Sequence, residues 1–331
     1  MRRREFIALT GGAAVAWQLS ARAQQPNHMR SVGVLMAYDE TDPEAKALLA
    51  AFTQGLSELG WTDGRNLRLD VRWAPGNTDA MRTYVKELVA LQPDVILANT
   101  TVVTAAFQRE TQTIPIVFSI VADPVGSGFV ASLSRPRGNI TGFGSVEASF
   151  ASKWLELLTE IAPNIKRTAI MFNPETAPYI RSTFLPLFEV AAQSFKVTLI
   201  LAPVHDDDEI EMAINALGHE PGGGLLAMPD NFVEVHRARI VSLAVRSNVP
   251  TVSQSAVIAR DGGLLSDAAD FRDIFRRSAR YVDGILRGAK PSELPVQMPI
   301  KYLMVINLKT ARALGLTVPP ALLVAADEVI E

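Results

Sequence analysis

The sequence predicts an α/β fold of two doubly wound parallel-sheet lobes joined by a three-segment hinge. Short apolar runs rich in Val, Ile and Leu alternate with amphipathic stretches along most of the 331 residues. Runs that are apolar throughout, rather than at every second position, are typical of parallel strands covered by helices on both faces. Nine such runs are more than one sheet usually holds, so two sheets are expected.

The predicted strands are separated by polar turns and by segments with the apolar periodicity of helices. They cover residues 31–38, 67–74, 94–100, 114–121, 139–146, 167–173, 196–204, 223–229 and 250–256. Between the first two strands, residues 43–60 repeat apolar side chains at spacings of three and four, which places these side chains on one helical face. Helices are also predicted after the acidic cluster 205–209, at about 232–246 and at about 271–287.

Three irregular segments, 134–145, 254–270 and 287–299, are predicted to carry the chain between the lobes. They are rich in Pro, Gly and polar residues and interrupt the alternation of strands and helices. The first lobe would then contain residues 31–140 and 260–290, and the second lobe residues 141–259 and 291–331. Three crossings suit a binding protein that closes on its ligand by hinge motion, whereas one open sheet with long loops is the alternative.

The first 23 residues are predicted to be a cleavable signal peptide of the twin-arginine type. Arginines at positions 2–4 precede an apolar run of 13 residues, Ile7–Leu19, which is shorter than the roughly 20 residues that span a bilayer as a helix. Small residues at positions 21 and 23 favour cleavage between Ala23 and Gln24, and the start of the chain resembles the twin-arginine motif. We therefore expect the mature protein in the periplasm; a buried N-terminal helix is the alternative.

Composition argues against several classes of protein. Residues 1–23 contain four arginines and one glutamate, so their removal changes the formal net charge from −3 to −6. A mildly acidic chain lacks the basic surface that binds the phosphates of nucleic acids, so no nucleic-acid partner is expected. The chain has no cysteine, which excludes disulfides and a cysteine nucleophile. The four histidines share no metal-binding spacing, and we expect a monomer without a cofactor or a metal.

Four stretches of the sequence have a distinctive order of residues. They are GNITGF (138–143), KWLELLTEIAPNIKRTAIMFNPETAP (153–178), GGGLLAMPDNF (222–232) and the C-terminal stretch 276–331. In these stretches the chain resembles the solute-binding proteins of ABC importers, a family whose characterised members include tryptophan and tyrosine binders. The likeness extends over about residues 31–331. It implies the type I periplasmic binding-protein fold, a small-molecule ligand held between the lobes, and an ABC permease in the inner membrane as partner.

Candidate ligand-binding residues lie directly after the predicted strands. Ligands of open parallel sheets bind beyond the carboxyl ends of the strands. The residues at these positions are Tyr38, Asp39, Asn99, Thr100, Thr101 and Asp123 in the first lobe and Asn173, Asp230 and Asn231 in the second lobe, with Ser266 and Asp267 near the second hinge segment.

These residue types suit a ligand that carries opposite charges. Thr100 and Thr101 open a predicted helix, where free N–H groups and the helix dipole favour a ligand carboxylate; ordinary helix capping is the alternative. Asp123 and Asp230 each have the charge to pair with a ligand ammonium group, or else serve locally as turn or cap residues. Tyr38 is placed either to stack on a flat ligand or to pack in the core.

The ligand class stays open at this point. Members of the family often have a tyrosine-glycine pair after the serine of the second hinge segment, whereas Asp267 and Ala268 follow Ser266 here. We therefore expect a small carboxylated solute, such as an aromatic or branched amino acid or an aromatic acid. We expect a binding protein rather than an enzyme. The alternatives are a periplasmic sensor that serves a chemoreceptor or sensor kinase, and an enzyme on the same scaffold.

Overall fold

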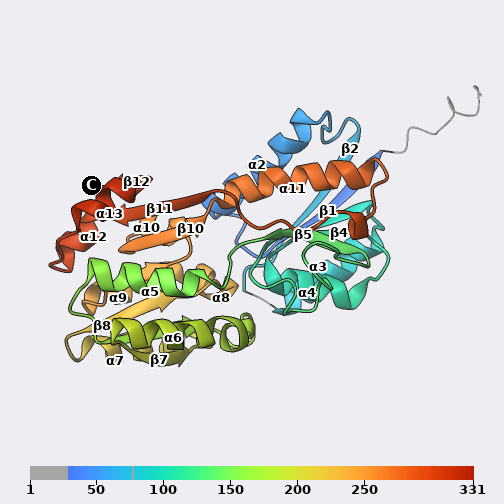
Figure 1. The fold of residues 1–331 in the computed structure, drawn as a ribbon. Coiled ribbons are helices and arrows are strands. Elements are labelled where there is room, and N and C mark those ends of the chain that lie inside the picture. The colour runs from blue at the N-terminus through green and yellow to red at the C-terminus, as the bar shows by residue number, and fades with distance from the viewer. Residues whose placement is uncertain (1–28, 77) are drawn as a thin grey trace, which may run out of the picture.

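Two β-sheets divide the chain into two lobes (Figure 1). The structure is a computed structural model that describes residues 29–76 and 78–331. The predicted signal peptide, residues 1–23, lies outside the described residues. In the part of the chain that the structure describes, no helix is both long enough and apolar enough to cross a membrane. The predicted fold class of two doubly wound α/β lobes is confirmed.

The first lobe is built on a five-stranded parallel sheet with the strand order β2-β1-β3-β4-β5. Its strands are β1 (Arg30–Met36), β2 (Leu67–Trp73), β3 (Val95–Asn99), β4 (Ile116–Val121) and β5 (Ile140–Gly144). Helices α2 (Pro43–Glu58) and α11 (Phe271–Leu286) cover one face, and α3 (Thr78–Ala90) and α4 (Thr100–Glu110) cover the other. Burial on both faces explains why β3 and β4 are apolar along almost their whole length.

The second lobe is built on a seven-stranded sheet with the order β12-β11-β10-β9-β8-β6-β7. Its strands are β6 (Arg167–Phe172), β7 (Thr198–Pro203), β8 (Gly223–Ala227), β9 (Thr251–Ser253), β10 (Leu265–Ala269), β11 (Tyr302–Asn307) and β12 (Glu328–Ile330). Only the β10–β11 pair is antiparallel among these described strands. Helices α5 (Phe150–Ile161) and α6 (Leu185–Phe195) cover one face, and α7 (Asp207–Gly218) and α9 (Arg237–Arg246) cover the other.

Shorter helices complete the two lobes. They are α8 (Asn231–Val235), α10 (Ala256–Arg260), α12 (Leu308–Ala313), α13 (Pro320–Ala325), the π-helix η1 (Ile180–Phe184) and the 3-10 helix η2 (Pro291–Glu293). The single helix predicted at about 232–246 is in fact two, because α8 ends and α9 begins at His236. Aspartates cap several helices: Asp42 accepts hydrogen bonds at the start of α2, as do Asp206 at α7 and Asp270 at α11.

The lobe boundaries differ from the predicted ones in the C-terminal third of the chain. Strand β10 pairs with β9 and β11, so this part of the predicted first-lobe segment 260–290 lies in the second lobe. Val296 packs in the core of the first lobe, so the start of the predicted second-lobe segment 291–331 lies in the first. The prediction was wrong because two polar side chains, Ser266 and Asp267, make β10 look like a hinge rather than a strand.

Three connections cross between the lobes: one after β5, one between β10 and α11, and one before β11. The Asp270 N–H donates to the Lys301 carbonyl oxygen at 2.9 Å, and the side chains of these residues form an ion pair of 2.6 Å. Phe150 stacks on Tyr302 with ring centroids 4.7 Å apart. The second connection is thereby held to the third, and the ring of Phe150 holds the first connection to the third as well.

Candidate functional site

A small cavity lies between the two lobes, at the carboxyl ends of strands from both sheets. It is lined by Tyr38, Thr100, Thr101, Val102, Ile120, Ala122 and Ser145 of the first lobe, by Thr176, Tyr179, Pro229, Asp230, Asn231, Glu234 and Gln254 of the second, and by Phe271 at the start of α11. Its volume of about 30 Å³ leaves room for about two water molecules. A solute as large as an amino acid therefore enters only when the lobes move apart.

Two cavity residues have an unusual backbone. Thr100 has a φ of +72° and Ile120 a φ of +62°, a left-handed conformation that β-branched residues rarely adopt. Ile120 sits in a β-bulge, because the pairing of β4 with β5 shifts register between Ser119 and Val121. Strained residues of this kind persist where the surrounding fold holds them in place, and they cluster at functional sites.

The start of α4 forms the polar side of the first lobe. Its cap residue, Asn99, makes no capping hydrogen bond, because its Oδ1 instead accepts from the N–H of Ala37 at 3.1 Å. Among the described residues, Asn99 Nδ2 and Thr100 Oγ1 are buried without a hydrogen-bond partner. The first turn of a helix also leaves N–H groups without partners inside the helix. These donors, with the positive end of the helix dipole, suit a carboxylate.

Asp230 forms part of the opposite wall but is occupied by its own lobe. One carboxylate oxygen accepts from the N–H of Asn173 at 2.6 Å, and the other accepts from Thr176 Oγ1 at 2.5 Å and the N–H of Phe232 at 3.0 Å. Burial raises the pKa of Asp230 to about 6, although these hydrogen bonds act in the opposite direction. Asp230 is thus both a helix cap and the tie between the loops after β6 and β8.

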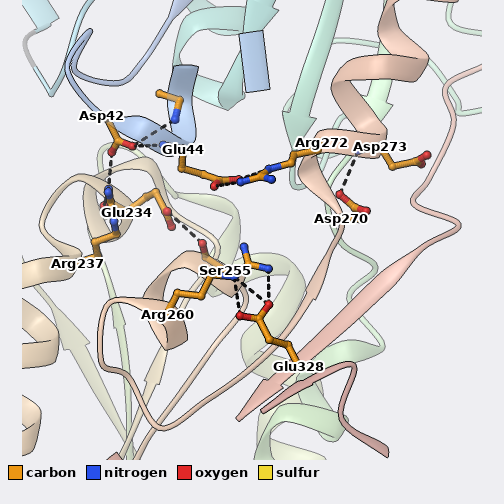
Figure 2. Close-up of polar contacts among 11 residues, drawn as sticks. Asp42, Glu44, Glu234, Arg237, Ser255, Arg260, Asp270, Arg272, Asp273 and Glu328 are labelled. Atoms are coloured by element: carbon orange, nitrogen blue, oxygen red, sulfur yellow. Dashed lines mark hydrogen bonds and ion pairs between the residues drawn. The ribbon is translucent and has the colours of Figure 1, made fainter. Parts of the chain in front are cut away.

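Glu234 is a second buried carboxylate in the same wall, and sequence reasoning missed it. It is 7% exposed, and its Oε1 accepts a hydrogen bond from Ser255 Oγ at 3.0 Å (Figure 2). Burial raises the pKa of Glu234 to about 7, against the lowering effect of the nearby Arg237. The sequence did contain a signal for it: Glu234 comes four residues after Asp230, and residues four apart on a helix lie on the same face.

Three aromatic residues also line the cavity. Tyr38 is buried beside the cavity, and burial together with the charge of Glu234 raises the pKa of its hydroxyl. Tyr179 donates its hydroxyl to the carbonyl oxygen of Pro229 and lies within hydrogen-bonding reach of Thr101 in the other lobe. Phe271 lies at the start of α11. Tyr179 and Phe271 do not directly follow a predicted strand, so the strand-end rule did not select them.

Five of the predicted residues line the cavity: Tyr38, Thr100, Thr101, Asp230 and Asn231. Asn99 and Asn173 lie beside it and shape the backbone. Asn99 is fully buried behind the start of α4, and the Asn173 side chain accepts from the N–H groups of Glu175 and Thr176 in the loop after β6.

The other four predicted residues do not line the cavity. Asp39 is exposed and accepts from the Thr41 hydroxyl and N–H, which lowers its pKa. Asp123 accepts from the N–H of Gly126 in its own turn and from Thr183 Oγ1 across the lobes, at 2.7 Å. Ser266 and Asp267 are buried in β10, where Asp267 pairs with Lys153 at 2.7 Å. These two were misplaced because β10 was taken for a hinge.

An ion pair joins the lobes next to Glu234. Arg237 Nη2 of α9 lies 2.6 Å from Asp42 Oδ2 at the start of α2 (Figure 2). Arg237 Nε lies 2.8 Å from Asp261 Oδ2 in its own lobe. Both partners across the lobes are largely buried. Two further pairs, Arg272 with Glu44 and Arg260 with Glu328, each join elements of a single lobe.

The cavity offers no built site for a metal ion. Within residues 29–76 and 78–331, no three His, Cys, Asp or Glu side chains gather in a way that would hold one. The polar groups of the cavity instead match an organic ligand with a carboxylate at one end and a hydrogen-bond donor at the other.

The fold and the site define a class of protein. Two α/β lobes, three crossings and a polar cavity between the carboxyl ends of both sheets are the architecture of a type I periplasmic binding protein. The chain belongs to the family of ABC transporter substrate binding proteins, which it matches over residues 37–330. The resemblance seen in the sequence is therefore confirmed.

Individual relatives agree with this assignment. The tyrosine-binding protein of Clostridioides difficile (strain R20291) is 24% identical over 266 residues, which are 80% of this chain and 75% of that protein. A conserved domain protein from Vibrio cholerae superposes with a TM-score of 0.84 at 28% identity, over 91% of this chain and 99% of that one. An ABC domain from Streptococcus pneumoniae in complex with L-Trp superposes with a TM-score of 0.83 at 25% identity and the same coverage.

Proposed function

We propose that the chain binds an amino acid between its lobes and delivers it to the permease of an ABC importer. One observation carries this proposal: the uncapped start of α4 faces a wall with two buried carboxylates across a single cavity. A zwitterion that leaves water needs both of its charges compensated, and these two surfaces compensate one charge each.

The carboxylate end of the ligand belongs at the start of α4. Thr100 lines the cavity, and its Oγ1 is a buried donor that has no partner among the residues that the structure describes. A buried donor without a partner costs about 1–3 kcal/mol, which a ligand carboxylate recovers on binding. The left-handed backbone of Thr100 is consistent with a residue that is held in position for this contact.

The body of the ligand belongs among the aromatic rings. Tyr38, Tyr179 and Phe271 line the cavity from both lobes and suit a flat side chain. Two relatives are named for tyrosine binding or were solved with L-Trp, which supports an aromatic amino acid. The departure at Asp267 and Ala268 does not weigh against this choice, because neither residue lines the cavity.

The cellular setting of the protein is part of the proposal. Residues 1–23 would direct export through the twin-arginine pathway, so a monomeric mature chain that begins at Gln24 would act in the periplasm. Binding would follow the opening and closing of the lobes about the three connections, since the ligand favours the closed form through contacts to both lobes.

Two measurements test the proposed function. Mass spectrometry of small molecules released from the purified mature chain should detect an amino acid, and calorimetric titration with the twenty standard amino acids should rank L-tryptophan or L-tyrosine first. The same titration with a simple sugar serves as the negative control. A chain that binds none of the twenty amino acids would disprove the proposed function.

A further inference from the structure

Resting on the proposed function, we propose that Glu234 is the counter-ion for the ligand's ammonium group, and that it restricts the site to solutes with a protonated amine. Two carboxylates, Asp230 and Glu234, reach the cavity from the second lobe, and both are at least nine-tenths buried. They differ in how many of their acceptor sites are already used.

Asp230 has little capacity left for a ligand. Three donors of its own lobe converge on it, from Asn173, Thr176 and Phe232, and they occupy both carboxylate oxygens. Its position is fixed by these bonds, because it caps α8 and ties two loops together. Its role is therefore to hold the wall in place.

Glu234 has acceptor capacity to spare. Ser255 Oγ donates to Oε1, and no other hydrogen bond to this side chain occurs within residues 29–76 and 78–331. A carboxylate offers about four acceptor positions. An ammonium group brings three donors and the opposite charge, which matches what Glu234 lacks.

The charges around the cavity leave Glu234 without a direct cationic partner. Of the residues that the structure describes, no Lys, Arg or His lines the cavity. Arg237 lies three residues further along the chain, but its guanidinium is bonded to Asp42 and Asp261. A neutral or anionic solute offers the Glu234 carboxylate no counter-charge, so Glu234 must take up a proton when such a solute binds, and this requirement disfavours solutes without an amine.

The titration of Glu234 depends on groups from several elements. Glu234 interacts electrostatically with four groups: Tyr38 after β1, Asp42 before α2, Arg237 in α9 and Asp261 after α10. Because burial raises its pKa to about 7, part of the unliganded protein carries a proton there at neutral pH. Binding of an ammonium group should release that proton into solution, and this release is measurable by calorimetry in buffers of different ionisation enthalpy.

The test compares a ligand with and without its amine on two variants. L-tryptophan and indole-3-propionate differ by the amine, and L-tyrosine and 3-(4-hydroxyphenyl)propionate form a second pair. Glu234→Gln keeps the shape and removes the charge, and Asp267→Asn is the control because Asp267 is an equally buried carboxylate outside the cavity. We expect Glu234→Gln to weaken binding of the amino acid at least tenfold, to leave binding of the amine-free analogue unchanged or stronger, and Asp267→Asn to alter neither.

Two outcomes overturn the inference, and they are distinguishable from failure of the proposed function. A parent protein that binds both members of a pair equally well retains the proposed function but does not select for an amine. Equal loss of both ligands in Glu234→Gln shows a structural role only. If the variant fails to fold, the parent still decides by its relative affinity for the two members of a pair. A parent that binds no amino acid at all removes the proposed function and the inference together.

Discussion

Arg237 of the second lobe and Asp42 of the first form an ion pair with 2.6 Å between Nη2 and Oδ2, and the two side chains are only 15% and 11% exposed. Arg237 lies three residues after Glu234, the proposed ammonium partner, at the start of the next helix. Closure of the lobes and recognition of the ligand charge therefore involve neighbouring side chains. The predictions below separate these two contributions.

Loss of the charge on Asp42 should weaken closure. Asp42→Asn keeps a good cap for α2 but removes the ion pair with Arg237, and Arg237 retains Asp261. We expect affinity for L-tryptophan to fall by roughly threefold to tenfold, about 1 kcal/mol, and the radius of gyration without ligand to rise in solution scattering. Asp206→Asn, the same change at the cap of α7, is the control. Unchanged affinity and scattering would show that the pair does not hold the lobes together.

Removal of the Thr100 hydroxyl should move stability and affinity in opposite directions. Thr100→Val keeps the shape and deletes a buried hydroxyl without a partner, so the unliganded protein should gain about 1 kcal/mol in denaturant unfolding. The same change should weaken binding of a carboxylate ligand by about tenfold. Thr168→Val is a matched control, because Thr168 Oγ1 is also buried without a partner in the described chain but lies outside the cavity. A Thr100→Val protein that binds as tightly as the parent would contradict the proposed carboxylate position.

The two aspartates that the sequence favoured should prove structural. Asp230→Ala leaves three donors without their acceptor and should reduce the free energy of unfolding by about 2–4 kcal/mol. Asp123→Ala loses one turn bond and the bond from Thr183, and should cost about 1 kcal/mol. Both variants should keep the preference for an amino acid over its amine-free analogue in calorimetric titration. Loss of that preference in Asp230→Ala alone would make Asp230, not Glu234, the ammonium partner.

Stability of the unliganded protein should fall as the pH rises from about 4 to 7. Burial raises the pKa of Asp230 to about 6 and of Glu234 to about 7, so in this range the folded state retains protons that the unfolded state has released. The loss should be on the order of 1–3 kcal/mol in urea unfolding. Carboxyls with lowered pKa, such as Asp94 and Asp270, act below this range.

The Glu234→Gln variant isolates one part of this pH dependence. Because glutamine does not titrate, the decline between about pH 5 and 7 should be smaller than in the parent, while the contribution of Asp230 remains. Identical curves for parent and variant would mean that Glu234 keeps an ordinary pKa in the folded protein.

Export should depend on the arginine pair at positions 3 and 4. Replacement of both by lysine keeps the charge but removes the guanidinium groups of the twin-arginine motif, so the precursor should accumulate in the cytoplasm. In the parent, N-terminal sequencing of periplasmic protein should begin at Gln24. Normal export of the lysine variant would argue for another pathway.

Most of the fold could be predicted from the sequence because most strands are buried on both faces. β3 was predicted at 94–100 and spans Val95–Asn99, since its run of apolar residues has no polar interruption. β10 was missed for the opposite reason, because the polar residues Ser266 and Asp267 lie within it. Its pairing with β9 and β11 forms only in the folded chain. No local pattern distinguishes such a strand from a polar loop.

The site was predicted only in part, for a related reason. Counting from strand ends finds Thr100 and Asp230, because Thr100 directly follows β3 and Asp230 comes three residues after the end of β8. Glu234 comes to the cavity through a further helical turn, and Tyr179 returns to it through a loop. Which of two carboxylates is free for a ligand depends on hydrogen bonds that form only in the folded chain.

The ties among the three connections have a mechanical consequence. With Asp270 bonded to Lys301 and Phe150 stacked on Tyr302, the three connections are coupled and move together as one flat hinge. A flat hinge of this kind bends easily out of its plane, but it resists sliding of one lobe past the other and rotation of the lobes within that plane. The lobes should accordingly move along a single angular coordinate, so that one pair of fluorophores, one on each lobe, would follow the whole motion.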